Sequence, residues 1–151
     1  MRVVYLVGTD HRFQRVGSFG VPEDVSAEFS AQLTQLITEH AVRSIAEEMS
    51  TEGLGLHRIH GGSLAFHLAR ELGLPHAYCD PPKNIREQQH IVSYADRERY
   101  WLDQLRAFAA FPCMFILGAD HVVTFSRLLN ESDFTATVLF DDWSPSLHVE
   151  A

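Results

Sequence analysis

Two four-residue motifs in this chain end in a histidine that follows an aspartate. They are GTDH at residues 8–11 and GADH at residues 118–121. An imidazole can bind a transition metal, or it can act as a general base near neutral pH because its ordinary pKa is about 6.5. His11 and His121 are therefore the first candidate site residues.

Each motif follows a short, continuous apolar run, at residues 3–7 and 113–117. Such runs are typical of strands that are buried on both faces of a parallel sheet. The glycine that opens each motif permits a tight turn. From Val122 onward apolar residues recur at helical spacing, so a helix is predicted there with Asp120 as its N-cap. Both histidines then lie at carboxyl ends of strands, where open α/β sheets bind ligands.

Strands alternate with helices along the rest of the chain. This alternation predicts a single α/β domain over residues 1–151, with a mainly parallel sheet of about five strands and helices on both faces. In the common order 3-2-1-4-5, strands one and four are neighbours at the topological switch point. The predicted strands are residues 2–7, 42–47, 76–79, 113–117 and 135–140, and the predicted helices lie within 26–40, 63–72, 83–108 and 121–130.

Acidic residues follow two other predicted strands. Glu47 ends the second strand and Glu48 comes directly after it, while Asp80 ends the third. Because the carboxyl ends of parallel strands share one edge of the sheet, we expect Glu47 beside the two histidines. Glu48 and Asp80 are predicted ligand-binding residues, with Asp80 as the outer wall of the site.

Two imidazoles and one carboxylate can hold a divalent transition metal and leave positions open for water. The predicted metal ligands are His11, Glu47 and His121, with Mn, Zn or Co as candidate ions. Asp10 and Asp120 are predicted to bind or orient ligands beside them. Two alternatives stay open: each histidine helps to cap a helix, or one histidine acts as a general base without a metal.

A helix with an aromatic stripe is predicted from residue 94 to residue 108. At about 100° per residue Arg97 lies about 40° from Trp101, on the side expected to be buried, whereas Arg99 points well away. Arg97 is therefore predicted to reach the site, although an arginine on such a helix is also typical of a solvated face.

The remaining histidines give weaker signals. His57, His60 and His67 form a group, but Gly61 and Gly62 interrupt any helix that would hold all three. We interpret these histidines as solvated or packed against loops. Four others have no companions that indicate chemistry: His40, His76, His90 and His148.

Composition limits the class of protein. The chain has 151 residues, a net charge of −8, 46% hydrophobic residues and 21% charged residues. These values are those of an ordinary globular protein. The negative charge argues against a nucleic-acid polymer as partner. Two cysteines without a Cys-x-x-Cys motif indicate a reducing compartment. The chain enters a strand at once and has no long apolar stretch, so we expect a cytoplasmic protein that does not bind membranes.

Four segments together resemble the TraB/Tiki/erythromycin-esterase-like superfamily. VYLVGTDH is similar to its first strand and motif, SIAEE to its second strand, DRERYWL to its arginine-bearing helix and FILGADHVVTFSRLL to its closing motif. The resemblance implies His11, Glu47, Arg97 and His121 as site residues, with Glu48 and Arg99 as the competing choices. The superfamily includes a metal-dependent protease, a haem-binding protein and metal-independent esterases, so it implies a site rather than one reaction.

These observations together predict a small cytoplasmic hydrolase, metal-dependent, that acts on a small-molecule or peptide substrate. His11, Glu47 and His121 would bind a catalytic water, and Arg97 would stabilise the developing oxyanion. The alternatives are a non-catalytic module that binds a nucleotide or another anion in the same crevice, and a haem- or metal-binding protein without turnover. A homodimer that completes the site is a further possibility.

Overall fold

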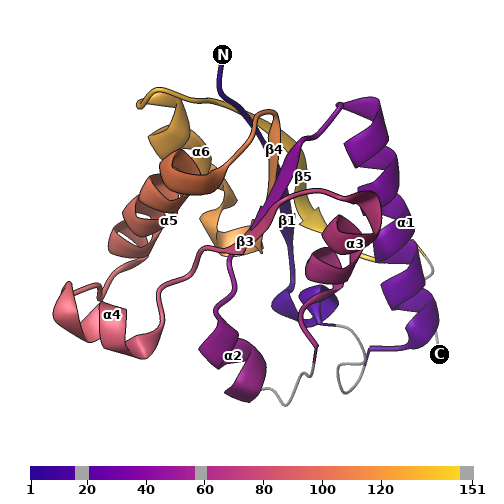
Figure 1. Ribbon diagram of the computed structural model, residues 1–151, viewed down its shortest axis with the longest axis horizontal. Coiled ribbons are helices and arrows are strands. Elements are labelled where there is room, and N and C mark those ends of the chain that lie inside the picture. The colour runs from indigo at the N-terminus through magenta and orange to yellow at the C-terminus, as the bar shows by residue number, and fades with distance from the viewer. Residues whose placement is uncertain (16–20, 57–60, 147–151) are drawn as a thin grey trace.

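A five-stranded, all-parallel sheet forms the centre of the computed structural model, which describes residues 1–15, 21–56 and 61–146. The strands stand in the order β3-β2-β4-β1-β5. Figure 1 shows helices on both sides of this sheet, so the predicted α/β fold is confirmed. The strands are β1 (Val3–Thr9), β2 (Ser44–Glu47), β3 (His76–Tyr78), β4 (Cys113–Gly118) and β5 (Thr135–Trp143).

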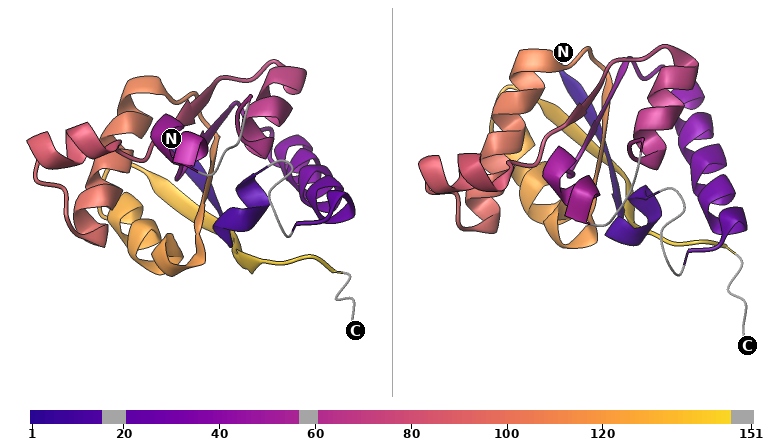
Figure 2. Two further views of the ribbon diagram at one scale, coloured as in Figure 1. Left: turned by 90° about the horizontal axis from the view of Figure 1, so that it is seen from below. Right: turned by 60° about the horizontal axis from the view of Figure 1, so that its bottom comes forward.

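Two pairs of helices cover the two faces. The helices α1 (Glu23–Glu39) and α3 (Leu64–Leu72) lie on one face, and α5 (Tyr94–Phe108) and α6 (Val122–Asn130) lie on the other. None of the helices in the described residues is long and apolar enough to cross a membrane. Four short elements gather near the carboxyl ends of the strands (Figures 1 and 2): η1 (His11–Gln14), η2 (Ala119–His121), α2 (Thr51–Leu56) and α4 (Lys83–Gln88).

The strand order differs from the common doubly wound order 3-2-1-4-5 because β1 and β4 exchange places. Strands β1 and β4 are neighbours, as predicted, with Thr9 opposite Gly118. However, β2 pairs with β4 rather than with β1, and Glu47 stands opposite Ile116. The second Gly-x-x-His turn therefore lies between the first turn and the end of β2. This order still brings all three strand ends together at one edge of the sheet.

The sheet separates two layers of hydrophobic core. On the α5 and α6 side, Trp101, Phe115 and Phe125 are fully buried. On the α1 and α3 side, Phe29 and Ile45 are fully buried. Every residue of β4 is buried. This agrees with its continuous apolar sequence. The strands that carry the candidate residues are thus fixed by packing from both faces.

Local capping explains where several elements begin and end. The predicted helix over residues 83–108 is divided in two, because Ser93 and Asp96 form a capping box that starts α5. Gly73 ends α3 in the left-handed region at φ 68°, a conformation that favours glycine after the last turn of a helix. The prediction that Asp120 caps a helix is wrong: it lies inside η2, and α6 begins without a side-chain cap. A 3-10 turn takes up the residues between β4 and α6.

Both cysteines are free and buried, which makes stability sensitive to alkaline pH. Burial raises the pKa of the Cys79 thiol, and it raises the pKa of Cys113 from the ordinary 9.0 to about 12. The unfolded chain therefore loses these protons first, so the free energy of unfolding should fall as pH rises from about 9 towards 12. Urea unfolding at a series of pH values measures this. A Cys113→Ala variant should show a shallower fall, and an unchanged slope would contradict the assignment.

Candidate functional site

Glu48, the residue after β2, lies at the centre of a polar cluster at the strand ends. Its side chain is only 3% exposed. Oε1 accepts a hydrogen bond from the Gly118 backbone N–H at 2.8 Å and lies 3.5 Å from His11 Nε2. Oε2 lies 3.5 Å from His121 Nε2 and 2.5 Å from Arg97 Nη2. The structure thus brings the two motif histidines and the predicted arginine together around one carboxylate.

Glu47 does not occupy this position, although the sequence and the resemblance pointed to it. Successive residues of a strand point to opposite faces of the sheet, so Glu47 faces away from Glu48. Its Oε2 lies 2.5 Å from Ser63 Oγ and 2.5 Å from His76 Nε2, and its Oε1 accepts from Gln14 Nε2 at 3.2 Å. The expected group of His11, Glu47 and His121 is therefore corrected to His11, Glu48 and His121.

A second carboxylate, that of Glu98, contacts His121 at Nδ1. Nδ1 lies 2.8 Å from Glu98 Oε2, and Thr124 Oγ1 donates to the same oxygen at 2.7 Å. A carboxylate accepts only, so the neutral ring carries its proton on Nδ1 and directs the Nε2 lone pair towards Glu48. His121 is thus arranged to take up a proton at Nε2.

His11 has an amide, that of Gln14, rather than a carboxylate as the partner of its Nδ1. Its Nδ1 lies 2.6 Å from Gln14 Oε1, and Gln14 Nε2 donates to Glu47. Because Glu47 can only accept, the amide of Gln14 must present its oxygen to His11, which places the proton of the neutral ring on Nδ1. The side chain of His11 is 41% exposed, so this ring faces the solvent more than His121 does.

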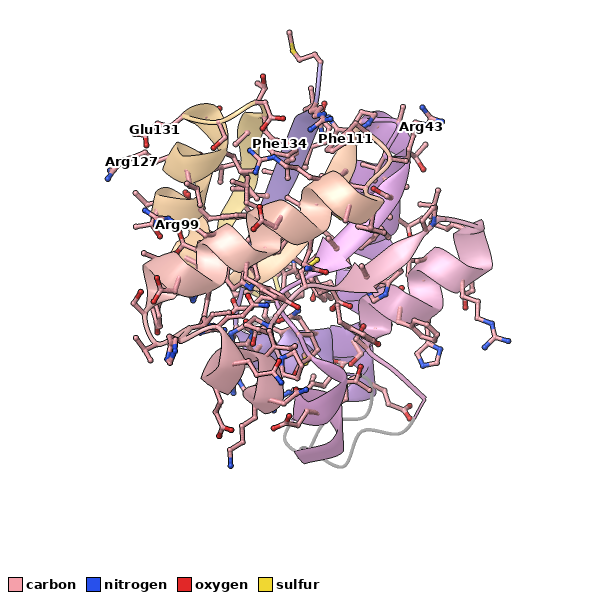
Figure 3. All side chains as sticks on the ribbon, turned by 60° about the vertical axis from the view of Figure 1, so that its left-hand side comes forward. Arg43, Arg99, Phe111, Arg127, Glu131 and Phe134 are labelled. Atoms are coloured by element: carbon pink, nitrogen blue, oxygen red, sulfur yellow. The ribbon has the colours of Figure 1, made fainter. Side chains whose placement is uncertain are left out.

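Arg97 is fixed by two carboxylates and two rings. It contacts Glu48, donates from Nε to Asp80 Oδ1 at 3.0 Å, and lies 5.8 Å from the Tyr94 ring centre and 5.6 Å from that of Trp101. Burial alone would lower the pKa of Arg97, but the nearby Asp80 and Glu48 outweigh it and raise the pKa above its usual range. Arg99 is exposed and lies on the outer side of α5, towards Arg127 of α6 (Figure 3). The helical spacing therefore distinguished the two arginines as predicted.

Asp80 lies behind Arg97 as a buried anchor. It accepts from Trp101 Nε1 at 3.1 Å and from Arg86 Nη2 at 2.6 Å, in addition to Arg97. The predicted outer wall of the site is therefore a carboxylate that holds two guanidinium groups.

Asp10 and Asp120 lie at the exposed rim of the site. Asp10 accepts from the Arg12 backbone N–H at 2.9 Å and pairs with the Arg12 guanidinium at 3.1 Å. Burial would raise the pKa of Asp10, but these contacts and the nearby His11 hold it below its ordinary value. Asp120 lines the pocket beside His121. Asp10 therefore fixes η1, which carries His11, rather than orienting an imidazole directly.

The cluster opens into a pocket of about 440 Å³. His11, Glu48, Arg97 and His121 all line it, and Tyr94 forms part of its wall. The Tyr94 ring lies against His121 with 4.1 Å between ring centres. The pocket has the size of a small-molecule site, and each of the two Gly-x-x-His turns contributes a histidine to its lining.

Three polar residues of this site were missed in the sequence. Glu98 lies three residues before Trp101 on the buried stripe of α5, a helical spacing that could have identified it. Gln14 carries no sequence signal, because only the turn of η1 brings it back to His11. His76, for which the sequence indicates no companion, pairs with Glu47 across the neighbouring strands β2 and β3. His57 and His60 lie outside the described residues, and His67 lies half-buried in α3.

The contacts of Glu48 favour a site without the predicted metal. An ion shared by the two histidines would need Glu48 as its carboxylate ligand, but Gly118 and Arg97 already engage its two oxygens. A divalent cation there would also be repelled by the guanidinium beside it. Within residues 1–15, 21–56 and 61–146, no group of three His, Cys, Asp or Glu side chains could hold a metal ion.

No protein-family model, curated protein or solved structure matches the chain significantly.

Gly118 is required by the close approach of His11. A Cβ atom at this position would lie 2.8 Å from His11 Nε2 and 3.2 Å from Glu48 Oε1. Gly118→Ala should therefore displace the His11 ring and lower any activity of the site at least tenfold. Gly73→Ala is the matched control, because a Cβ there meets no atom within 4 Å. Only its left-handed φ is strained, at a cost of about 1 kcal/mol. Equal activity of the two variants would contradict the close approach.

Proposed function

We propose that this protein is a metal-independent hydrolase that cleaves an ester, amide or phosphoester bond of a small molecule in the pocket between His11 and His121. One observation carries the proposal. His121 lines the pocket and is held by Glu98 at Nδ1, while its Nε2 lies 3.5 Å from Glu48 Oε2, the oxygen that Arg97 also contacts. A general base is held in this way in hydrolases.

The neighbouring side chains divide the roles. His121 Nε2 takes a proton from a water molecule as that water attacks the carbonyl or phosphoryl centre, and Glu98 stabilises the imidazolium that forms. His11, with an amide at Nδ1, accepts a hydrogen bond from the water through Nε2 and orients it. His121 then returns the proton to the leaving group, so that no net proton is consumed within the site.

Arg97 stabilises the negative charge that develops on the substrate oxygen. Its Nε and Nη2 are held by Asp80 and Glu48. Among the described residues Nη1 has no partner, so it remains for a substrate oxygen. Because the guanidinium is fixed before the substrate binds, it need not reorganise as charge develops. Glu48 is therefore a positioning residue that keeps Arg97 and the two imidazoles in one arrangement.

A panel of 4-nitrophenyl carboxylic and phosphoric esters tests the proposal, assayed with and without EDTA. The untagged protein should hydrolyse at least one class, and EDTA should change the rate less than twofold. Isothermal titration with Zn²⁺ and Mn²⁺ should show no stoichiometric binding. Stoichiometric binding that His11→Ala abolishes, together with loss of activity in EDTA, would replace this proposal with the metal-dependent form.

The same protein distinguishes the non-catalytic alternatives. Saturable binding of a nucleotide without turnover of any ester would favour a binding module in the same crevice. A Soret band on addition of haem that disappears in His11→Ala would favour a haem-binding protein. Either result would overturn hydrolysis as the function.

A further inference from the structure

A second hollow, of about 400 Å³, adjoins the pocket of about 440 Å³ that His121 lines, which we call the reactive pocket. The two hollows share His11, Glu48 and Arg97 as a common wall. The second extends away from His121 towards α2 and α4. His11, Glu48 and Arg97 thus border both hollows, whereas His121 lines the first.

The two hollows differ in the balance of the charged side chains that line them. Among their described lining residues, the reactive pocket has one arginine against four carboxylates, which are Asp10, Glu48, Asp120 and Asp142. The second hollow has three carboxylates, Glu48, Glu52 and Asp80, against four cations, Arg15, Lys83, Arg86 and Arg97.

Buried contacts hold part of this positive charge in place. Arg86 donates from Nε to the Pro81 carbonyl at 2.8 Å and from Nη2 to Asp80 at 2.6 Å. Two of its three nitrogens thus fix the plane of the guanidinium at the wall. Asp80 is 9% exposed and also contacts Arg97, which Glu48 contacts in turn, so Arg86 shares its carboxylate partner with a second guanidinium.

Lys83 contributes a more mobile cation to the same wall. Its side chain is 76% exposed, and its Nζ lies 4.0 Å from Glu87, at the limit of an ion pair. Such an exposed pair contributes little stability, so the ammonium can turn to a ligand at small cost. A fixed guanidinium and a mobile ammonium together suit a carboxylate or a phosphate group.

We propose that the substrate carries an anionic group, a carboxylate or a phosphate, which binds in the second hollow against Arg86 and Lys83 while the scissile bond lies beside His121. This inference rests on the proposed hydrolase function and adds the chemical class of the substrate. The carboxylates that line the reactive pocket repel the anionic group of the substrate. The difference in charge between the two hollows therefore sets the orientation in which the substrate binds.

A matched pair of esters tests the proposal. Mono-4-nitrophenyl glutarate and 4-nitrophenyl valerate have acyl chains of equal length, and only the first carries a terminal carboxylate. The anionic ester should have a KM at least tenfold lower at similar kcat. In Lys83→Met with Arg86→Met this preference should fall to within twofold, through KM rather than kcat. A preference that survives in the double variant would overturn the proposal.

Two controls separate a specific site from a general loss of charge or fold. Arg99→Met removes a cation from the outer side of α5 and should leave the preference unchanged. Lys83→Met alone removes no buried contact, so it should keep the melting temperature and still lower the preference about threefold. An unchanged preference in that single variant would contradict a role for Lys83.

Titration with inorganic phosphate and with glutarate distinguishes the two anions and tests the site without turnover. Millimolar binding that shifts backbone NMR signals around Lys83 and Arg86, and that the double variant loses, is expected for the anion whose chemistry the site accepts. Anion binding without hydrolysis of any ester would overturn the hydrolase proposal but keep the anion site. Hydrolysis without preference or anion binding would overturn this inference alone.

Discussion

His121→Asn should lower kcat/KM for ester hydrolysis at least a hundredfold. The substitution removes the nitrogen that accepts the proton from water, and general-base catalysis contributes about 10²–10⁴-fold in rate. Asparagine is smaller than histidine and polar, so the buried position beside Glu98 can keep a hydrogen bond. Steady-state kinetics on the best ester of the panel, with a melting curve of each variant, measures the effect.

His90→Asn is the matched control for this substitution. His90 is exposed just after α4 and has a φ of 53°. Asparagine tolerates this left-handed conformation. The kcat/KM of the variant should stay within twofold of the parent protein. A His121→Asn variant that remains folded and keeps more than a third of the activity would show that His121 is not the base.

The two histidines should also act as one unit. If His11 orients the water that His121 deprotonates, the double variant with both replaced by asparagine should be little slower than the slower single variant. If each histidine only supports its own turn, the losses of stability should add and activity should follow stability. Kinetics and urea unfolding of the three variants separate these cases.

Arg97→Ala should destabilise the fold by about 3–5 kcal/mol, because it removes the cation from two buried carboxylates. Glu48 and Asp80 would both lose a contact of 3.0 Å or less. The same substitution should also abolish measurable hydrolysis. Urea unfolding at pH 7 gives the first quantity and the ester assay the second.

Arg99→Ala tests the specificity of that effect. Arg99 lies on the same helix but on its exposed side (Figure 3). The free energy of unfolding should therefore change by less than about 0.5 kcal/mol, as for most surface substitutions. Similar losses in the two variants would mean that Arg97 supports the helix rather than the site. Arg97→Lys should recover part of the stability and little of the activity, because an ammonium cannot reproduce the planar group that bridges Asp80 and Glu48.

The positions of the two turns could be predicted from local sequence. A continuous apolar run predicts a buried strand, and the glycine after it predicts the turn that places His11 or His121 at the strand end. Gly118 is needed at its position for a different reason from the tight turn that the sequence predicted. Gly118 has an ordinary φ of −61° and is needed because the imidazole of His11 lies against it, a contact between segments far apart in sequence.

The choice between Glu47 and Glu48 could not be predicted in the same way. It depends on which of two adjacent residues faces α5, and that depends on the pairing of β2 with β4. A shift of one residue would exchange the two side chains between the faces of the sheet. Which of two adjacent residues at a strand end faces the site therefore cannot be predicted without the tertiary structure. Arg97 and Arg99, by contrast, lie on a helix and were distinguished by helical periodicity alone.

The central claim, that His11 and His121 serve one site around Glu48, can be tested most directly by long-range ¹H–¹⁵N NMR of the imidazole side chains. At a pH where the rings are neutral, both should be Nδ1–H tautomers, because Gln14 and Glu98 lie closer to Nδ1 than Glu48 does to Nε2. Glu48→Gln should shift the Nε2 signals of both rings, whereas Glu47→Gln should leave His121 unchanged. Nε2–H tautomers, or an His121 signal that does not respond to Glu48→Gln, would contradict the shared site.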